Sequence, residues 1–216
     1  MKPAVLYRTH QAARTRRQIL RVAMDIASAE GLEGLSIGRL AADMKMSKTG
    51  IFSHFGSKRE LQLATVEAAK QVFVERIVQP ALMEPGGTLR LTAMLYKWLE
   101  YVEKIVFRGG CFFAAASAEF DSRPGAVRNQ IVLHTRAWLI GLEDEIRFAI
   151  SNGQFRSSVD AVQLAFELHA YVQEANWAFK LFNDKSAFER ARRSIGRSIS
   201  EASENQSAKI PDRREQ

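Results

Sequence analysis

The sequence predicts an all-α protein of about nine helices, and two observations support this prediction. Apolar residues recur at intervals of three and four through most of the 216 residues, as they do on one face of an α-helix. No segment alternates steadily between apolar and polar residues, as a half-buried strand would. We therefore expect a bundle of three short helices at the N-terminus and a larger helical region after it.

Three short helices are expected near the N-terminus. Their expected ranges are 12–30, 37–43 and 48–54. Gly31 follows the first helix as a left-handed C-cap, and Ser36 and Ser47 are suited to cap the N-termini of the second and third. Ile51 and Phe55, four residues apart, anchor the third helix to the others.

The helices that follow are mostly longer. Ser57 and Glu60 match a capping box, which begins a helix that reaches residue 79 and ends at Pro80. The helices expected after it run from Thr88 through Val106, over 112–119, from Pro124 up to Asn152, over 160–182 and over 185–202. Residues 160–182 carry two apolar stripes, so we expect both sides of this helix to be covered. Residues 203–216 have almost no apolar content and are expected to form a disordered tail.

Composition limits the class of protein. Of all residues, 46% are hydrophobic and 25% are charged, which is typical of a globular protein. No apolar run approaches the ~20 residues that cross a bilayer, and the N-terminus lacks the apolar core of a secretion signal. The one cysteine, Cys111, excludes an internal disulfide and fits a reducing compartment. We expect a cytoplasmic protein that does not enter the membrane.

The positive charge is concentrated at one end of the chain. The formal net charge is +7, and residues 1–60 contain eleven Lys/Arg and five Asp/Glu, which leaves only +1 for the remainder. A segregated positive block is typical of a module that binds a polyanion such as nucleic acid. A solvated basic surface gives the same composition, so charge alone leaves both interpretations open.

Residues 35–54 suggest a helix-turn-helix, because two short helices are joined there by a tight turn. In this motif the second helix lies in the major groove of DNA. Since Ile51 and Phe55 face inward, groups suited to base edges and phosphates are left outside. These groups are Lys48, Thr49, Ser53 and His54, with Gly50 allowing close approach of the helix backbone. The alternative is an ordinary solvent-exposed turn of helix.

The segment LAADMKMSKTGIFSHFGSKRELQLA (40–64) resembles the helix-turn-helix of the tetracycline-repressor (TetR) family. The positions in register with the family pattern are Ala41, Ser47, Ile51, His54, Phe55, Ser57, Lys58 and Leu61. The resemblance covers residues 12–72 and implies a DNA-binding domain there. It also implies that residues 73–202 form a helical domain that binds a small molecule and dimerises through the last two helices.

Lys58 and Arg59 stand in the first turn of a helix, where positive charge opposes the helix dipole at about 0.3–1 kcal/mol each. A DNA phosphate at this N-terminus reverses that effect, because it meets backbone N–H groups and a cation together. In the resemblance, Lys58 is the family's phosphate-contacting lysine, and arginines that begin the first helix are candidates for flanking contacts. The candidate DNA-binding residues are Arg16, Arg17, Ser36, Ser47, Lys48, Thr49, Gly50, Phe52, Ser53, His54 and Lys58.

Two residues depart from the family pattern. Phe52 stands where a tyrosine usually donates to a phosphate, so its ring is left to pack against the sugar–phosphate edge or neighbouring helices. Lys45 replaces the turn glycine. If its backbone is left-handed, it carries about 1 kcal/mol of strain; otherwise the turn itself differs, and we favour the different turn.

Bulky side chains on converging stripes are candidates for the small-molecule pocket. They are Trp98, Val102, Phe113, His134, Trp138 and Tyr171. Plain core packing is the alternative for each, and His134 is better interpreted as a hydrogen-bonded core histidine. Cys111 is a candidate redox sensor or, alternatively, a small buried hydrophobe.

Together these features predict a homodimeric, sequence-specific transcriptional regulator that binds a pseudo-palindromic operator and is a repressor released by a small-molecule effector. A non-specific DNA-compacting protein is the first alternative, but it leaves the C-terminal helices without a role. A cysteine enzyme that pairs Cys111 with His134 or His169 is the second. No metal-ligand spacing or cofactor motif is evident, so we expect no metal, no cofactor and no catalysis.

Overall fold

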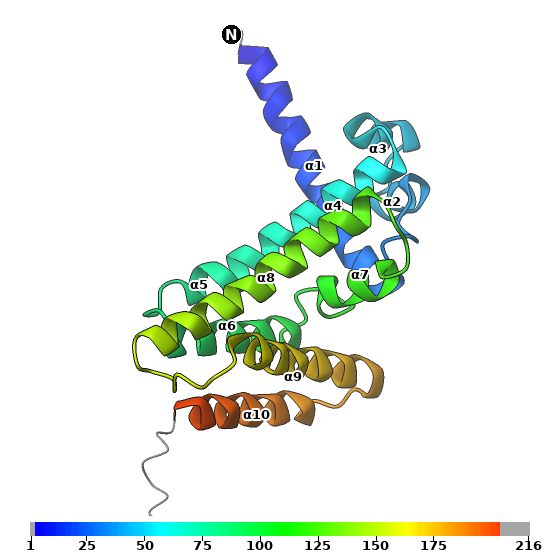
Figure 1. Ribbon diagram of the computed structural model, residues 1–216. Helices are drawn as coiled ribbons and strands as arrows, with labels where there is room; N and C mark the ends of the chain where they lie inside the picture. Colours follow the sequence, from blue (N-terminus) through cyan, green and yellow to red (C-terminus); the bar gives the residue numbers. More distant parts are fainter. Residues whose placement is uncertain (1–2, 204–216) are drawn as a thin grey trace, which may run out of the picture.

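The computed structural model describes the backbone of residues 3–203 and the side chains of residues 10–203. Over the described backbone the fold is all-helical, as predicted, with no strand (Figure 1). The elements are α1 (Pro3–Glu30), α2 (Ile37–Met44), α3 (Lys48–Phe55), α4 (Lys58–Phe73), a π-helical segment η1 (Val74–Val78), α5 (Gln79–Ala81), α6 (Thr88–Glu103), α7 (Phe112–Phe120), α8 (Ala126–Ser151), α9 (Ala161–Phe182) and α10 (Ser186–Ser203). The predicted tail lies outside the described residues except for Ser203, which ends α10. None of these helices is long and apolar enough to span a bilayer.

Side chains cap the short helices as the sequence predicts. The capping serines are Ser36, Ser47 and Ser57, each accepting from the N–H group three residues on at 3.0–3.1 Å. Asp160 caps α9 by accepting from two backbone N–H groups. The capping box before α4 is only half formed, because the Ser57 N–H donates to the Phe55 carbonyl at 2.8 Å rather than to Glu60.

The turn between α2 and α3 keeps a left-handed residue in the place of the family's glycine. Lys45 has φ 53° and ψ 38°, so our expectation of a different turn is wrong. Its N–H bonds to the Ala42 carbonyl and that of Met46 to the Ala41 carbonyl, which closes α2 in a Schellman motif. The strain of about 1 kcal/mol is therefore present at Lys45.

The helix that begins after Ser57 continues past its predicted end. α4 passes through the wider turns of η1 into α5, which ends at Ala81. Pro80 lies in the first turn of α5, where a residue without an N–H group is tolerated. Pro80 therefore does not end the helix as predicted.

α6 ends at Glu103 rather than at Val106. Ile105 has a φ of 52° and is 53% exposed, so it does not share the buried face of α6 that the periodicity indicated. The following residues turn back to α1, where the N–H groups of Arg108 and Gly109 donate to side chains at 2.9 and 3.1 Å. Contacts with a distant helix thus override the local helical pattern.

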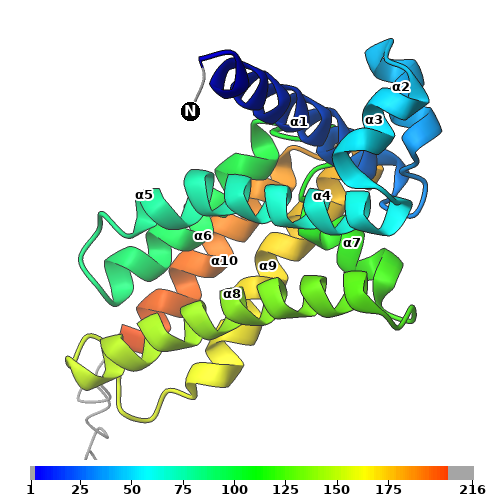
Figure 2. The same ribbon diagram turned by 90° about the horizontal axis from the view of Figure 1, so that it is seen from above.

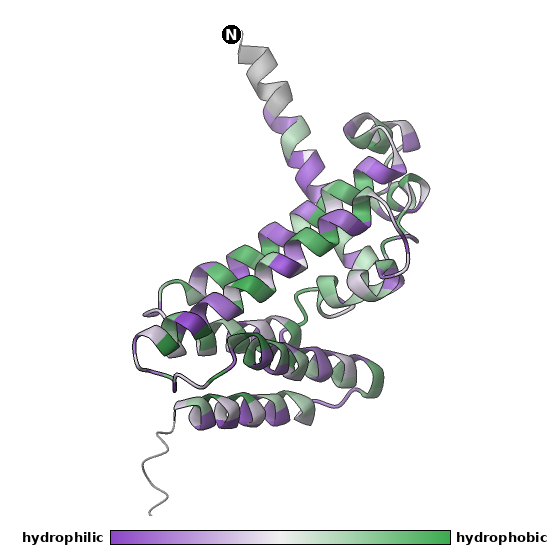
Figure 3. Cartoon of the chain, in the orientation of Figure 1, coloured by the Kyte–Doolittle hydropathy of each residue, from purple (hydrophilic) through white to green (hydrophobic). Residues whose placement is uncertain are grey.

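The helices are amphipathic and pack on a continuous apolar core. Most helices carry both hydrophobic and hydrophilic residues (Figure 3). α4 packs on α1 and lies along α8, and α9 packs on both α8 and α10 (Figures 1 and 2). α4 therefore connects the helix-turn-helix with the C-terminal helices.

α9 is covered on two sides within this chain, by α8 and by α10, but part of its second stripe stays exposed. Its first predicted stripe is buried, with Leu164, Leu168 and Val172 at 7% exposure or less. On the second stripe, Phe166 and Trp177 are 66% and 50% exposed. His169 and Gln173 of the same stripe are partly buried beside α6 and α8, so the single chain covers the second stripe in part.

Candidate nucleic-acid interface and candidate ligand cavity

α3 presents a compact exposed surface, which we call the α3 face. It consists of four exposed side chains of α3: Lys48, Thr49, Phe52 and Ser53. Ile51 and Phe55 are buried beneath it and fix the helix to α1, α2 and α4. His54 is partly buried, with its ring tilted against Phe55 at 6.3 Å between centroids. The predicted outward set thus lies together, except that His54 is turned toward the protein.

Gly50 serves the α3 cap as well as the exposed surface. Its N–H donates to Ser47 Oγ at 3.0 Å, and its carbonyl accepts from Ser53 Oγ at 2.8 Å. A Cβ at this position would lie 3.1 Å from Ser47 Oγ, which is tighter than an ordinary contact. A side chain here would therefore crowd the cap.

Phe52 is only about half covered by the protein. Its side chain is 52% exposed on the α3 face. About half of the ring surface is therefore free, and both contacts expected for it stay predictions.

The two candidate arginines of α1 are both exposed, but among the side chains described here a cation–π contact holds one of them in place and not the other. The Arg16 guanidinium lies over the Phe55 ring, 5.0 Å from its centroid. Such a cation–π contact contributes about 0.5–1 kcal/mol at an exposed site. Arg16 is therefore held next to α3, whereas no cation–π contact supports Arg17 within the described side chains.

Lys58 already has an anionic partner in the structure. Its Nζ lies 2.7 Å from Glu33 Oε1, and both side chains are close to half exposed. The hydrogen bond from Lys58 is the largest cause that lowers the pKa of Glu33, and a second from Gln62 adds to it. A phosphate at the start of α4 must therefore displace Glu33, at the small cost of an exposed ion pair.

Glu33 is itself positioned by the C-terminal helices. The Glu119 carboxylate of α7 accepts from the N–H groups of Leu32 and Glu33 at 2.6 and 3.0 Å. Gln62 of α4 donates to the Leu32 carbonyl at 3.0 Å. The partner of Lys58 thus rests on α7.

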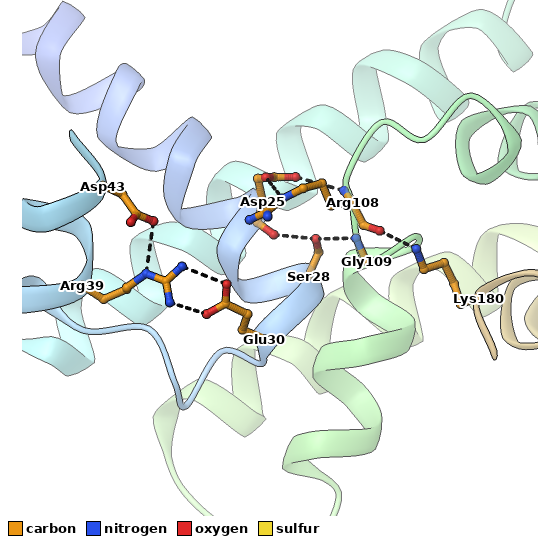
Figure 4. Close-up of polar contacts among 8 residues, drawn as sticks. All are labelled: Asp25, Ser28, Glu30, Arg39, Asp43, Arg108, Gly109 and Lys180. Carbon is orange, nitrogen blue, oxygen red and sulfur yellow. Dashed lines mark hydrogen bonds and ion pairs between the residues drawn. The ribbon is translucent and has the colours of Figure 1, made fainter.

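Polar contacts join α1 to both sides of the molecule (Figure 4). Toward α2, Arg39 donates to Glu30 at 2.6 and 2.9 Å and to Asp43 at 3.1 Å. Toward the C-terminal helices, the N–H of Gly109 donates to Ser28 Oγ. A Cβ at Gly109 would lie 1.7 Å from the Ser28 carbonyl oxygen, so only glycine fits this contact.

The loop that contains Gly109, residues 104–111, also contacts α9. The N–H and side chain of Arg108 donate to Asp25, and its carbonyl accepts from Lys180 (Figure 4). Cys111, two residues after Gly109, donates its N–H to Asn176 Oδ1 at 2.9 Å. Loop 104–111 therefore links α1 to α9.

A cavity of about 260 Å³ opens between the C-terminal helices. Side chains from α4, η1, α6, α7, α8 and α9 line it: Lys70, Phe73, Val74, Val78, Met94, Trp98, Phe113, Ala114, Ser117, His134, Thr135, Ala137, Trp138, Gly141, His169 and Gln173. The mostly apolar wall is that of a small-molecule site, and the volume lies just below the usual range of roughly 300–1,000 Å³. The π-helical turn lies in this wall, and such turns are frequent at functional sites.

The structure brings together four of the six predicted pocket residues. These are Trp98, Phe113, His134 and Trp138. Val102 lies one turn beyond Trp98 and is sealed in the core at 1% exposure. Tyr171 lies on the other side of α9 from the cavity, with its hydroxyl 3.3 Å from Ser198 Oγ of α10. Neither residue lines the cavity.

Sequence reasoning missed the contributions of α4, η1 and the second stripe of α9 to the cavity. His169 and Gln173, four residues apart, belong to that stripe and were a recognisable signal. Phe73 and Val74 carried no such signal, because they continue the ordinary apolar pattern of a helix.

Charge is weak inside the cavity. Burial lowers the pKa of His169 to about 4, so its imidazole is neutral at physiological pH. Burial also lowers the pKa of His134, against the opposing effect of Glu67, whose Oε2 lies 3.2 Å from His134 Nε2. Lys70 lies 3.3 Å from Glu67 Oε1. The charged groups therefore gather around Glu67, on the side of α4.

Cys111 is fully enclosed. It is 1% exposed, and burial raises the pKa of its thiol. A protonated, enclosed thiol is a poor nucleophile and a poor redox sensor, which favours the small buried hydrophobe. Among the described residues, no three His, Cys, Asp or Glu side chains are placed to hold a metal ion.

Two family models match the chain. The model described as "Bacterial regulatory proteins, tetR family" matches residues 19–65, which include α2, α3 and the first half of α4. The model described as "Tetracyclin repressor-like, C-terminal domain" matches residues 87–195, about half of the chain. The second match contains α6, α7, α8 and α9 and with them most of the cavity wall.

Individual proteins agree with these matches. The chain is 30% identical over 79 residues to "HTH-type transcriptional regulator TcmR" of Streptomyces glaucescens, which is 36% of this chain and 35% of that relative's length. A TetR transcriptional regulator from Chloroflexus aurantiacus has a TM-score of 0.82 at 23% identity, over 88% of this chain and 96% of that one. AibR, solved with isovaleryl coenzyme A and operator DNA, has a TM-score of 0.68 at 22% identity, over 87% and 97%. At these identities the two structures show the fold.

Proposed function

Because this chain belongs to the TetR family of bacterial transcriptional regulators, we propose that it is a repressor whose operator binding is released by a small molecule in the cavity. The observation that carries this proposal is that α4 joins an exposed α3 face to an apolar cavity, because α4 packs on α3 and also lines the cavity. We assign DNA binding to residues 12–72 and ligand binding and dimerisation to residues 73–202. The protein would act in the cytoplasm, where its operator is.

α3 is proposed to lie in the major groove. Lys48, Thr49 and Ser53 are exposed on the α3 face and reach base edges. The groups around them contact the backbone of the DNA, namely Arg16, Arg17, Ser36, Ser47, Phe52, His54 and Lys58. Lys58 meets its phosphate together with the free N–H groups of the first turn of α4.

A second copy of the chain is proposed to cover α9 and α10. Apolar side chains lie exposed along α9 and at its end, and they include Phe166 at 66%, Trp177 at 50% and Phe182 at 63%. Trp177 and Phe182 stack edge to face at 5.0 Å. A two-fold dimer through these helices presents two α3 faces to a pseudo-palindromic operator, with half-sites about one helical turn apart or a little more.

Ligand and DNA are proposed to compete through α4 and α7. α4 begins at Lys58 and lines the cavity with Lys70 and Phe73. α7 lines the cavity with Phe113 and also holds the Glu33 turn through Glu119. A ligand that binds better to the form with wrongly spaced α3 faces shifts the population away from DNA. AibR, solved with isovaleryl coenzyme A and operator DNA, supports a regulator of this fold that binds both a small molecule and DNA.

A gel-shift experiment tests the proposed function. The DNA upstream of the protein's own gene is titrated at two salt concentrations in the presence of random competitor DNA. We expect a discrete complex that resists the competitor and weakens steeply with salt. Equal affinity for random DNA would instead support a non-specific DNA-compacting protein and contradict the repressor proposal.

A further inference from the structure

Unpartnered polar atoms gather at the cavity. Among the side chains of residues 10–203, eight buried nitrogen or oxygen atoms lack a hydrogen-bond partner. Six of them belong to residues that line the cavity: Trp98, His134, Thr135, Trp138, His169 and Gln173. A buried polar atom without a partner costs about 1–3 kcal/mol, so such a concentration indicates a site that a ligand completes.

Two of these six residues, His134 and Trp98, have a polar group close by, and the other four have none among the described side chains. His134 Nε2 lies 3.2 Å from Glu67 Oε2, although without the alignment of a hydrogen bond. The Trp98 indole lies close enough to the Cys111 thiol to lower its pKa against the effect of burial. The remaining polar atoms are Thr135 Oγ1 and Trp138 Nε1 of α8 and His169 Nδ1 and Gln173 Oε1 of α9.

These four atoms need both hydrogen-bond donors and hydrogen-bond acceptors as partners. The indole N–H of Trp138 only donates, and Gln173 Oε1 only accepts. The Thr135 hydroxyl does both, and the neutral imidazole of His169 offers one donor and one acceptor. A ligand that satisfies them carries an acceptor and a donor, as a hydroxyl group does.

The walls around these atoms are aromatic. Phe73 and Trp138 meet edge to face at 4.9 Å between ring centroids, and Trp98 and Trp138 meet at 5.4 Å. Phe113 packs on Phe73 at 6.1 Å. Such a wall provides flat apolar surfaces for a ring-shaped ligand.

The cavity offers little to a charged ligand. Among the described side chains, Lys70 is the one charged residue in its wall, and its ammonium is already 3.3 Å from the Glu67 carboxylate. A carboxylate that would balance a cation is absent from the lining residues. An ion that enters therefore loses its hydration without a new partner, which is costly.

We propose that the effector is an uncharged aromatic molecule that carries at least one hydroxyl group, held between Trp138 and Gln173. This inference rests on the proposed function, because it assumes that the cavity is the effector site. It separates this chain from AibR, which was solved with a coenzyme A thioester. Such a polyanion has no unpaired cation among the residues that line this cavity.

Titration calorimetry with four probes on one ring system tests the proposal in the full chain without DNA. The probes are 2-naphthol, 2-methylnaphthalene, 2-naphthoate and 2-naphthylmethylammonium. We expect 2-naphthol to bind at least about fivefold more tightly than either charged probe, because the ions leave their hydration uncompensated. Tighter binding of a charged probe, or no binding of 2-naphthol, would overturn the proposal.

A pair of glutamine variants on α9 tests the hydrogen bond separately. Gln173→Leu removes the acceptor in the cavity, and we expect it to weaken 2-naphthol about three- to tenfold while 2-methylnaphthalene keeps its affinity. Gln163→Leu is the matched control, because Gln163 is exposed and bonds to Glu167 at 2.8 Å outside the cavity. Equal losses for both probes in Gln173→Leu would show a merely structural role and contradict the proposal.

This outcome is separable from that of the proposed function. Calorimetry reports the cavity alone, whereas the gel shift reports the DNA interface alone. A specific DNA complex together with a preference for the charged probes would refute the effector class and leave the repressor standing. A lack of DNA specificity together with the expected order of probe affinities would refute the repressor proposal and leave the ligand class of the cavity standing.

Discussion

The α3 face and the cavity are built in opposite ways. The α3 face and its caps come from one stretch of chain, residues 47–58, in which the polar groups of Ser47, Ser53 and Lys58 already have partners. The cavity takes its wall from six elements between residues 70 and 173, and six of its lining residues carry a buried polar atom without a partner among the described residues. DNA binding therefore exchanges one partner for another, whereas ligand binding supplies partners that are missing.

This difference has an energetic consequence. Replacing an exposed ion pair such as Lys58–Glu33 by a phosphate contact changes little in the fold, since exposed pairs contribute at most about 1 kcal/mol. Filling the cavity satisfies buried atoms inside the core that α4 and α7 also share. We therefore expect the ligand, and not the DNA, to determine which arrangement of these helices is stable.

The largest effect is expected where α1 meets loop 104–111. Gly109→Ala places a methyl group 1.7 Å from the Ser28 carbonyl oxygen, so the loop must move away from α1. We expect a loss of about 3 kcal/mol in the free energy of unfolding, at the upper end for overpacking. Urea unfolding followed by circular dichroism measures it.

Gly141→Ala is the matched control at the cavity wall. The added Cβ there meets Met94 Cε at 3.6 Å, an ordinary contact, and α8 gains helix propensity. We expect the free energy of unfolding to rise by about 0.5–1 kcal/mol. Equal destabilisation by both variants would show that the junction is no more constrained than the cavity.

The next effect concerns pH and the cavity. His169 has a folded pKa of about 4, below its usual 6.5, so the unfolded chain binds its proton first as the pH falls. The contribution of the neutral His169 imidazole to the free energy of unfolding is therefore fully present above pH 6.5. It is lost progressively as the pH falls from 6.5 to about 4. We expect wild type to lose about 2 kcal/mol more than His169→Gln between pH 7 and pH 5, measured by urea unfolding. Parallel pH profiles for the two proteins would contradict the burial of His169.

A smaller effect is expected at the start of α4. Lys58→Ala should weaken binding to all DNA sequences by about tenfold and reduce the salt slope by about one, as a phosphate contact does. Glu33→Gln should strengthen binding by up to about fivefold, because it removes the competitor for Lys58. Fluorescence anisotropy of a labelled operator measures both.

Lys97→Ala is the control for these charge changes, because Lys97 pairs with Glu100 at 3.1 Å on α6, away from α3. Its DNA affinity should match wild type. Weaker DNA binding by Glu33→Gln would mean that Glu33 orients Lys58 for the phosphate rather than competing with it.

The smallest effect is expected on the α3 face itself. Phe52→Tyr adds a hydroxyl to a ring that is 52% exposed, which supplies the phosphate donor that the family pattern contains. We expect DNA binding to tighten about two- to fivefold, as for one added hydrogen bond. Phe148→Tyr, on the 47% exposed ring of α8, should change nothing. An unchanged affinity for Phe52→Tyr would place the ring away from the phosphates.

Local features of this fold could be predicted from the sequence, and contacts between distant segments could not. Ser36, Ser47 and Ser57 cap helices as expected, because a cap depends only on the next three residues. The end of α6 was predicted wrongly, since Asp25 and Ser28 on α1 draw loop 104–111 away from the helical path. Periodicity within one segment carries no information about such partners.

The same limit separates the two candidate sites. The outward position of Lys48 and Thr49 follows from the helical spacing of Ile51 and Phe55. For the cavity, spacing identified aromatic stripes but not which side of each stripe faces the opening, so Val102 and Tyr171 were included wrongly. Lys45 shows a third case, in which a left-handed backbone is kept although the glycine that favours it is gone.

The central claim is that two α3 faces of a dimer read one operator, and hydroxyl-radical footprinting of the upstream DNA tests it most directly. We predict a single protected region with two related halves, centred about one helical turn apart or a little more. Lys58→Ala should lower its occupancy without moving it. Protection spread evenly along the DNA, or one unpaired half-site at saturation, would contradict the account.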